Sequence, residues 1–268
     1  KFSPNSTNLE VFYVAIINTF VCAGVGIILS TILGLLIGIA RLSSNYLISR
    51  LSNAYIELFR NIPILLQILF WYNIFLNALP HPKKSISFLD FIFINNRGFY
   101  LPNPIPQDGF IWAIIAFIVG IGSAIYLKRH FKRKQDETGK QTNTIGYSLA
   151  LILLFPIVVF LLLGSPLQLD YAILGKFNLK GGLAIVPEFV ALTLALSVYT
   201  ATYIAEAIRS GIEAVDKGQK EAAAAIGLTP IQSLKLVVLP QALRVAIPPT
   251  INQYLNLTKN SSLAAAIG

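Results

Sequence analysis

The sequence predicts an all-α, polytopic membrane helix bundle, and three observations support this fold class. Of the 268 residues, 55% are hydrophobic and only 12% are charged, whereas a soluble domain carries about 25% charged residues. The mean hydropathy is +0.67. The charged residues also lie between long uncharged runs, several of them near the roughly 20 residues that a spanning helix needs. Together these features exclude a disordered chain, a disulfide scaffold and most soluble enzymes.

Uncharged windows locate the expected spans. Five of them cover 11–40, 61–82, 109–127, 141–169 with its apolar run 145–164, and 189–205 with an extension toward Arg209. A sixth window begins after Arg244, but only fourteen residues separate it from Lys259. At 1.5 Å per residue this is shorter than the roughly 30 Å hydrocarbon core. We therefore expect six spans, with the sixth helix continuing past Lys259 and buried among other helices.

The distribution of basic residues predicts the orientation. Fourteen Lys and Arg residues lie in 41–60, 128–144 and 209–244, against six in 1–10, 80–109 and 165–186. The positive-inside rule places the first set in the cytoplasm and residue 1 outside. The net charge of +9 is thus attributed to cytoplasmic loops in contact with a lipid bilayer, and no nucleic acid partner is expected.

The sequence lacks the residue patterns of common catalytic and metal sites. Cys22 is the single cysteine, which excludes a disulfide framework and a thiolate metal site, and His81 and His130 are isolated. No GxxxxGK[ST], HExxH or GxSxG motif occurs. We therefore expect no catalytic residues, no enzymatic activity and no metal or cofactor bound by this chain.

The most informative segment is the cytoplasmic connector 213–240, whose first part predicts a short helix. Asp216 is expected to cap it, with Gln219 closing a capping box. The run EAAAAI at 221–226 favours a helix, and Gly227 is a natural helix stop. The small residues 222–225 would allow another surface to approach closely.

A second short helix is expected directly after this one. Thr229 and Gln232 have the spacing of a capping box, with Pro230 in the first turn, and Pro240 is expected to end the helix. The product would be a rigid helix-turn-helix. Spacing alone supports two interpretations equally: a coupling element for a peripheral protein, or an interfacial hairpin without a partner.

The same connector resembles a known family. Glu221-Ala222-Ala223, Gly227, and Val237 before Leu239-Pro240 are spaced as in the EAA loop of importer permeases of the ATP-binding cassette class, which prefer Ile at the Val237 position. Other stretches are similar to the polar amino acid branch of that family. These are Asn18-Thr19, GIARLSS at 38–44, YIELFRNIPILLQ at 55–67, YTATYIAEAIRSGI at 199–212, KGQKEAA at 217–223 and the segment 239–268. NNRG at 95–98 and the extra hairpin at 110–164 are similar to the longer subunits of general L-amino acid or glutamate/glutamine/aspartate uptake systems.

The resemblance implies a fold and a domain organisation. A type I transmembrane permease domain would cover 11–268. An inserted region at 80–182 would contain external loops and an extra hairpin of spans 110–127 and 145–164, and the EAA coupling loop would be 213–240. Longer subunits of this family have a further helix before position 1 and another after Gly268, which implies eight helices in the parent protein and six here.

The resemblance also implies partners. They are a second permease subunit, expected to be a distinct homologue, two ATPase subunits that hold ATP and Mg, and a periplasmic amino-acid-binding protein. The location would be the bacterial inner (plasma) membrane. The amino acid substrate would be acidic or neutral polar, and the permease would provide the translocation path.

Two groups of candidate site residues follow. By the resemblance, the ATPase coupling residues would be Asp216, Lys217, Glu221, Ala222, Ala223, Gly227, Leu239 and Pro240. Asp216, Lys217 and Arg209 only flank the coupling surface, and exposed, solvated charge is the favoured interpretation of these three. Glu57 with Arg60, and Glu206 with Arg209, are spaced i,i+3 near expected cytoplasmic helix ends. We favour structural pairs at the membrane boundary over gate residues, because unpaired charge there is costly.

A polar string in the last expected span forms a third group. It contains Asn252, Gln253, Asn256, Thr258, Lys259, Asn260, Ser261 and Ser262. Polar groups in hydrocarbon must be paired or face water. A lining of the translocation path, with Lys259 near the amino acid carboxylate, and hydrogen bonding between helices are equally supported. Gly34 and Gly38 match GxxxG, for which close helix packing suffices.

Three other functions compete with that of an importer permease. A secondary transporter or channel would usually show inverted repeats or intramembrane acids, and neither is visible. A membrane-embedded enzyme would need clustered catalytic residues. A purely structural assembly subunit stays open, and dependence on an ATPase would exclude the first two.

Overall fold

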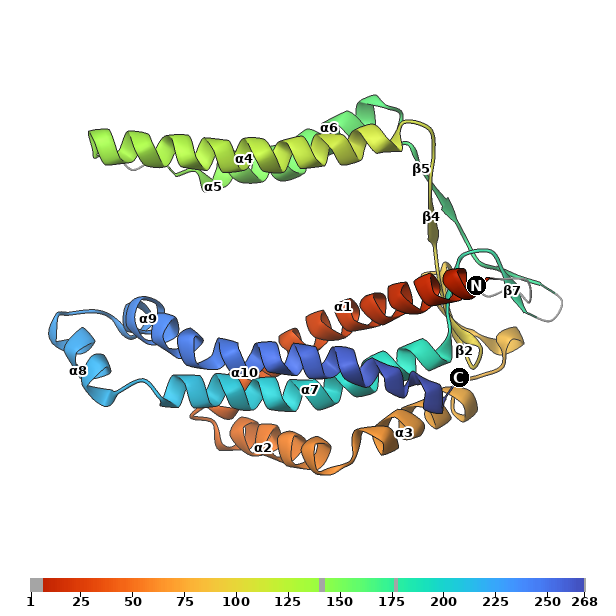
Figure 1. Ribbon diagram of the computed structural model, residues 1–268, viewed down its shortest axis with the longest axis horizontal. Coiled ribbons are helices and arrows are strands. Elements are labelled where there is room, and N and C mark those ends of the chain that lie inside the picture. Colours follow the sequence, from red (N-terminus) through yellow and green to blue (C-terminus); the bar gives the residue numbers. More distant parts are fainter. Residues whose placement is uncertain (1–6, 140–142, 176–177, 268) are drawn as a thin grey trace. The chain divides into compact units, whose positions relative to one another are not determined.

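The computed structural model describes residues 7–139, 143–175 and 178–267 (Figure 1). The chain divides into two compact units. Unit 1 comprises Lys1–Ile86, Ile94–Phe99 and Ile185–Gly268, and unit 2 comprises Ser87–Phe93 and Tyr100–Ala184. Short strands β1 (Ile86–Phe88), β2 (Ile92–Asn95), β3 (Gly98–Leu101) and β8 (Leu183–Ile185) form a sheet in the order β1-β2-β3-β8, and a single 3-10 turn, η1 (Pro82–Lys84), precedes them.

Five helical stretches in the described residues are long and apolar enough to cross a membrane, or six if a bent pair counts as one span. The five are α1 (Asn8–Arg41), α4 (Phe110–Thr138), the stretch Ile145–Leu162, α7 (Pro187–Glu213) and the stretch Pro230–Ala266. The bent pair is α2 (Tyr46–Asn61) with α3 (Ile64–Asn77). An all-α membrane bundle is therefore confirmed.

The second expected span, 61–82, is not confirmed as a spanning helix, because its helix α3 has only 14 residues and is too short to cross a hydrocarbon core by itself. α2 and α3 are bent by 102° at the break between them. Pro63 disfavours the helical conformation of the residue before it, and Ile62 is extended, with φ −89° and ψ 125°. The buried Gln67 stabilises the break, since its Nε2 donates hydrogen bonds to the carbonyls of Phe59 (2.7 Å) and Ile62 (2.9 Å).

Two other expected boundaries also shift. α1 begins at Asn8, because Thr7 and Glu10 form a capping box ahead of the apolar run. α4 continues to Thr138 through the basic run 128–134, which was expected to lie in a loop. Lys and Arg are good helix formers, so the helix extends beyond its apolar part into this run.

The last helical stretch corrects the expectation for Pro240, which does not end a helix. The stretch consists of α9 (Pro230–Ser233), a π-helical turn η3 (Leu234–Val238), α10 (Leu239–Asn260) and a 3-10 turn η4 (Ser261–Ala266). Pro240 lies in the first turn of α10, directly after η3. A proline ring clashes with the carbonyl four residues earlier in a regular helix, and the wider π turn avoids that clash.

Unit 1 is organised around α7, which packs against α1, α2, α3 and α10. Small residues set the close approach of α1 and α7, because Gly26, Ser30, Gly34 and Gly38 recur every four residues on the buried face of α1. A Cβ on Gly34 would lie 2.7 Å from the Cβ of Ile204. The Gly34–Gly38 spacing therefore marks close helix packing, as the sequence predicts.

Hydrogen bonds between helices add to this packing. The Tyr55 hydroxyl of α2 donates to the carbonyl of Val198 in α7 (2.9 Å). The hydroxyls of Thr31 in α1 and Tyr254 in α10 lie 2.8 Å apart. The apolar core of the unit contains Cys22, Ala23, Ile68, Ala191, Leu192, Ala195, Leu196, Leu257 and Ile267.

Unit 2 contains a helical hairpin and two strand pairs. α4 packs against α5 (Ile145–Leu149), the π turn η2 (Ala150–Leu154) and α6 (Phe155–Leu162) through a seam of small residues around Gly120. Strand β4 (Asn103–Pro106) pairs antiparallel with β5 (Leu167–Asp170), and β6 (Ile173–Leu174) with β7 (Leu179–Lys180). The residues of this unit lie in the expected inserted region 80–182, except for the last two, which extend it to Ala184.

Candidate functional site

The connector after α7 folds into a compact turn around α8 (Lys217–Ala225), at the end of unit 1 opposite the first turns of α1 (Figure 1). Asp216 caps α8 as predicted, with its Oδ1 accepting from the Gly218 amide at 2.6 Å. The expected capping-box role of Gln219 is wrong. Its Oε1 accepts instead from Nε2 of Gln241 at 3.3 Å, which ties α8 to α10.

Gly227 ends α8 in the left-handed conformation, with φ +81°. The Gly227 amide donates to the carbonyl of Ala224 (3.0 Å), and the Leu228 amide donates to that of Ala223 (3.1 Å). These two bonds form a Schellman motif, which satisfies carbonyls that a helix end otherwise leaves free. The position requires a residue that tolerates positive φ, and glycine does so at no steric cost.

The helix that follows is capped as predicted. The Thr229 amide donates to Oε1 of Gln232 (2.9 Å), and the Gln232 amide donates to Oγ1 of Thr229 (3.4 Å). Pro230 occupies the first turn. Both helices therefore meet at a turn whose backbone groups are bonded on each side, which makes the turn rigid.

The exposed face of α8 differs from the expected one. Glu221, Ala222 and the two alanines after Ala223 are exposed, together with Asp216 and Lys217. Ala223 is only 3% exposed and faces its own chain, so its small size serves packing within the turn. Ile226 is 77% exposed and places a large apolar side chain at the end of this face. Leu239 and Pro240 lie in α10, where Leu239 lines an apolar groove with residues of α1.

Four charged side chains form a network where α1 and α7 end. Glu206 accepts hydrogen bonds from Arg41 of α1 and from Arg209, the latter at 2.5 Å. Arg209 also pairs with Glu213. The predicted Glu206–Arg209 pair is thus present, and Arg41 extends it across two helices. All four side chains are partly exposed, so the network joins two helix ends at the edge of the bundle.

The other predicted pair, Glu57 with Arg60, is not formed in the part of the chain that the structure describes. The guanidinium carbon of Arg60 lies 4.9 Å from the centre of the Tyr203 ring instead, and Glu57 is exposed. A guanidinium is attracted to the face of an aromatic ring, and this contact competes with an exposed ion pair that contributes little. Arg60 and Tyr203 also line a cavity of about 270 Å³ with Glu206, Ala207, Ser210, Val245, Pro249 and Gln253.

The sixth helix was expected to be buried among other helices, but most of its polar string is exposed or half-buried within this chain. Asn252, Asn256 and Lys259 are exposed, Gln253 and Asn260 are half-buried, and Ser261 is buried. The hydroxyls of Ser261 and Thr258 bond to backbone carbonyls of their own helix. In the described residues, the five amide and amine side chains form no hydrogen bond with another helix. Because the uncharged run after Arg244 is short, the sequence correctly predicts that the helix continues past Lys259. The length of the run does not indicate which face of that helix is buried.

Three contributors to this region were not anticipated from sequence. Arg41 lies 165 residues from its partner Glu206, so no local spacing signals the contact. Tyr203 was not distinguished from other aromatic residues of a span. Ile226 does carry a signal, since it is a large apolar residue beside the helix-ending Gly227 in a cytoplasmic segment. No group of three or more His, Cys, Asp or Glu residues that could hold a metal occurs within residues 7–139, 143–175 and 178–267.

Comparisons with known proteins agree on one family. The family model for a binding-protein-dependent transport system inner membrane component matches residues 116–268. The general L-amino acid transport system permease protein AapQ of Rhizobium johnstonii is 49% identical over 267 residues, which is 100% of this chain and 67% of AapQ.

Two further relatives are similar over most of the chain. The putative amino-acid ABC transporter permease protein YhdX of Escherichia coli is 47% identical over 100% of this chain and 68% of its own length. The glutamate/glutamine/aspartate/asparagine transport system permease protein BztB of Rhodobacter capsulatus is 39% identical over 85% of this chain and 61% of its own length.

Proposed function

Because the chain belongs to the family of binding-protein-dependent transport system inner membrane components, we propose that it is the permease subunit of an ATP-driven amino acid importer. It is a multi-pass membrane protein, and we place it in the bacterial inner (plasma) membrane. Its relatives are named for general L-amino acid and for glutamate, glutamine, aspartate and asparagine transport. We assign acidic and neutral polar L-amino acids as its substrates on that basis.

The observation that carries this proposal is the turn around α8. α8 is a short helix that the Asp216 side chain caps at its start and that backbone hydrogen bonds close at its end, with a small-residue face and the exposed Ile226 beside Gly227. An apolar side chain of this size on a rigid, polar turn fits a partner pocket, as binding anchors usually do. In our proposal α8 docks on an ATPase subunit that holds ATP and Mg, and this chain holds neither.

The permease would also need a second permease subunit to complete the path. The exposed amides of α10 support this assignment, because polar groups of a spanning helix must be paired or face water. A distinct homologous subunit would cover part of this face, and a periplasmic binding protein would deliver the amino acid. Exchanging Lys259 for Met tests the path: unchanged transport at normal assembly would remove Lys259 from it.

The coupling proposal is tested by ATP hydrolysis in lipid nanodiscs that contain the full-length permease, its partner permease and the ATPase. Two variants of Gly227 make a matched pair. Valine cannot adopt φ +81° without strain, whereas asparagine tolerates the left-handed region. We expect amino-acid-loaded binding protein to stimulate hydrolysis in the unsubstituted and Gly227→Asn complexes but not in Gly227→Val.

An Ile226→Ser variant separates docking from folding of the turn. Its backbone can keep the helix end, so loss of ATPase association in this variant would locate the contact at the side chain. Absence of both ATPase association and stimulation in the unsubstituted complex would refute the proposal and favour a secondary transporter.

A further inference from the structure

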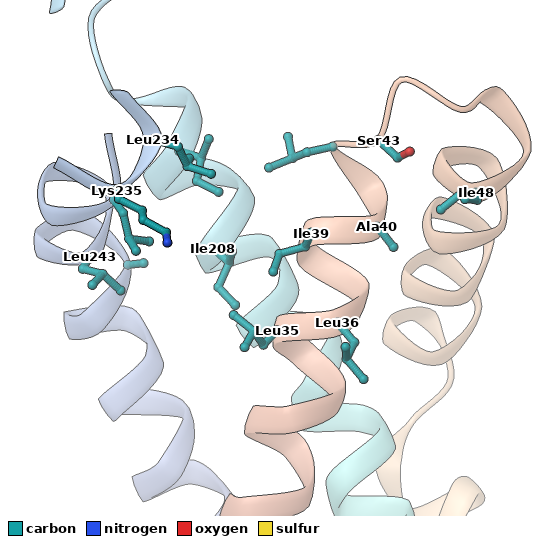
Figure 2. A pocket seen from close by; sticks show the side chains of 15 residues that line it. Leu35, Leu36, Ile39, Ala40, Ser43, Ile48, Ile208, Leu234, Lys235 and Leu243 are labelled. Carbon is teal, nitrogen blue, oxygen red and sulfur yellow. The ribbon is translucent and has the colours of Figure 1, made fainter. Parts of the chain in front are cut away.

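An apolar groove of about 850 Å³ opens between α1, α7 and the start of the last helical stretch (Figure 2). Thirteen of its fifteen lining residues are Leu, Ile or Ala, and the other two are Ser43 and Lys235. Its volume falls in the range of about 300–1,000 Å³ that is typical of ligand pockets. Leu36 and Ile39 are more than half exposed within the chain, and most of the other leucines and isoleucines that line the groove are more than one third exposed. The groove therefore presents a large uncovered apolar surface.

The depth of the groove matches one leaflet of a bilayer. Along the last helical stretch it extends from Leu234 to Ala246, twelve positions or about 18 Å at 1.5 Å per residue. Half of a hydrocarbon core of roughly 30 Å is about 15 Å. One end of the groove is lined by Leu42 and Ser43, directly after the end of α1, and by Ile212, next to the end of α7. Basic loops predict this end to be cytoplasmic.

Charge at that end is unbalanced. Figure 2 shows Lys235 and Ser43 at one end of the groove and Leu35 and Leu36 at the other, with the Lys235 nitrogen directed into the groove. Lys235 forms no ion pair among the described residues. The acids at the ends of the neighbouring helices do not supply one, because Glu206 and Glu213 are paired with arginines.

We propose that this groove binds an anionic glycerophospholipid of the cytoplasmic leaflet. An acyl chain would lie along the leucines and isoleucines of α1 and α10, and the phosphate would lie beside the Lys235 ammonium. A long apolar stem below a cationic group at the membrane boundary is the arrangement that a phospholipid complements. A covering polypeptide helix would satisfy the apolar walls but would not require the ammonium.

The test uses the full-length permease assembled with its partner permease and ATPase, purified in detergent. Native mass spectrometry would measure binding of palmitoyl-oleoyl phosphatidylglycerol and of the zwitterionic phosphatidylcholine with the same chains. We expect a preference for phosphatidylglycerol that falls about fivefold in Lys235→Gln, the contribution of one lysine near a membrane surface. Lys220→Gln, at an exposed lysine of α8, is the matched control and should leave the preference unchanged.

A second variant keeps the charge and fills the groove. Ile39→Trp should reduce binding of both lipids while the protein still assembles. A photoreactive benzophenone residue at position 243 should form an adduct with phosphatidylglycerol. Equal binding of the two lipids, an unchanged preference in Lys235→Gln, or an adduct with a polypeptide would each overturn the proposal.

Discussion

Replacing Gly34 by alanine tests the closest helix contact in unit 1. The added Cβ would lie 2.7 Å from both Cβ and Cγ2 of Ile204, roughly 1 Å inside the contact distance of about 3.5–4.0 Å between carbon atoms. The Cβ of Ile204 is fixed to its backbone and cannot rotate away, so α1 and α7 must separate. Overpacking of this kind costs about 1–3 kcal/mol.

Gly24→Ala on the same helix is the matched control, because a Cβ there meets nothing within 4 Å. Both substitutions gain the same helix propensity, about 1 kcal/mol, which cancels in their difference. We therefore expect Gly34→Ala to have a free energy of unfolding about 1–3 kcal/mol below that of Gly24→Ala.

The assay is unfolding in mixed SDS micelles followed by tryptophan fluorescence. The chain has two tryptophans, and Trp71 packs against the core of unit 1. A Trp112→Phe background makes Trp71 the single reporter, since Trp112 belongs to α4 in unit 2. Equal stability of the two alanine variants would refute the inferred contact between α1 and α7.

Three further predictions use the same unfolding measurement or a local one. Glu206→Gln removes the carboxylate that joins Arg41 to Arg209, while Arg209 keeps its pair with Glu213. It should lower the free energy of unfolding by about 1.5–3 kcal/mol, whereas Glu57→Gln should not change it; equal effects would argue against the network. Gln67→Leu removes the donor to two carbonyls at the break after α2 and should destabilise unit 1 by about 1–3 kcal/mol, and a neutral result would show that the carbonyls find other donors. Gly120→Ala would place a Cβ 2.2 Å from the Leu151 carbonyl oxygen and should speed hydrogen exchange in α4. Gly122→Ala, where a Cβ meets nothing within 4 Å, should not, and identical exchange in the two variants would contradict the packing of this hairpin.

The sequence predicts the number of spans and their approximate places because uncharged length is a local property that a bilayer imposes. The prediction of the spans fails where the backbone conformation, rather than the polarity of the side chains, determines the path of the chain. The window 61–82 contains Pro63, which turns the chain by 102° between α2 and α3. Pro240 has the opposite effect from the expected one, because the π turn before it lets the helix continue. A propensity rule cannot distinguish these two prolines without the neighbouring carbonyl geometry.

The candidate site likewise contains residues whose roles the sequence predicts and residues whose roles it does not. Asp216, Gly227 and the Thr229–Gln232 capping box were predictable, since caps and helix ends depend on three or four consecutive residues. The role of Arg41 was not, because its partner lies on another helix. The burial of Ala223 could not be predicted either, because an alanine in a short helix has the same helix propensity on a buried face as on an exposed one.

The burial of α7 has a consequence for how the chain enters the bilayer during synthesis. α7 carries hydroxyl groups at Thr193, Ser197, Thr200 and Thr202, and all four are buried against neighbouring helices or backbone. Its most apolar stretch is less hydrophobic than that of α1, which is apolar on its exposed faces and can partition into lipid by itself. α1 is synthesised earlier and presents a glycine seam to the later helix. We therefore expect the weakly hydrophobic central helix to insert against α1 already in the membrane, so that loss of the α1 seam would leave α7 poorly inserted as well as poorly packed.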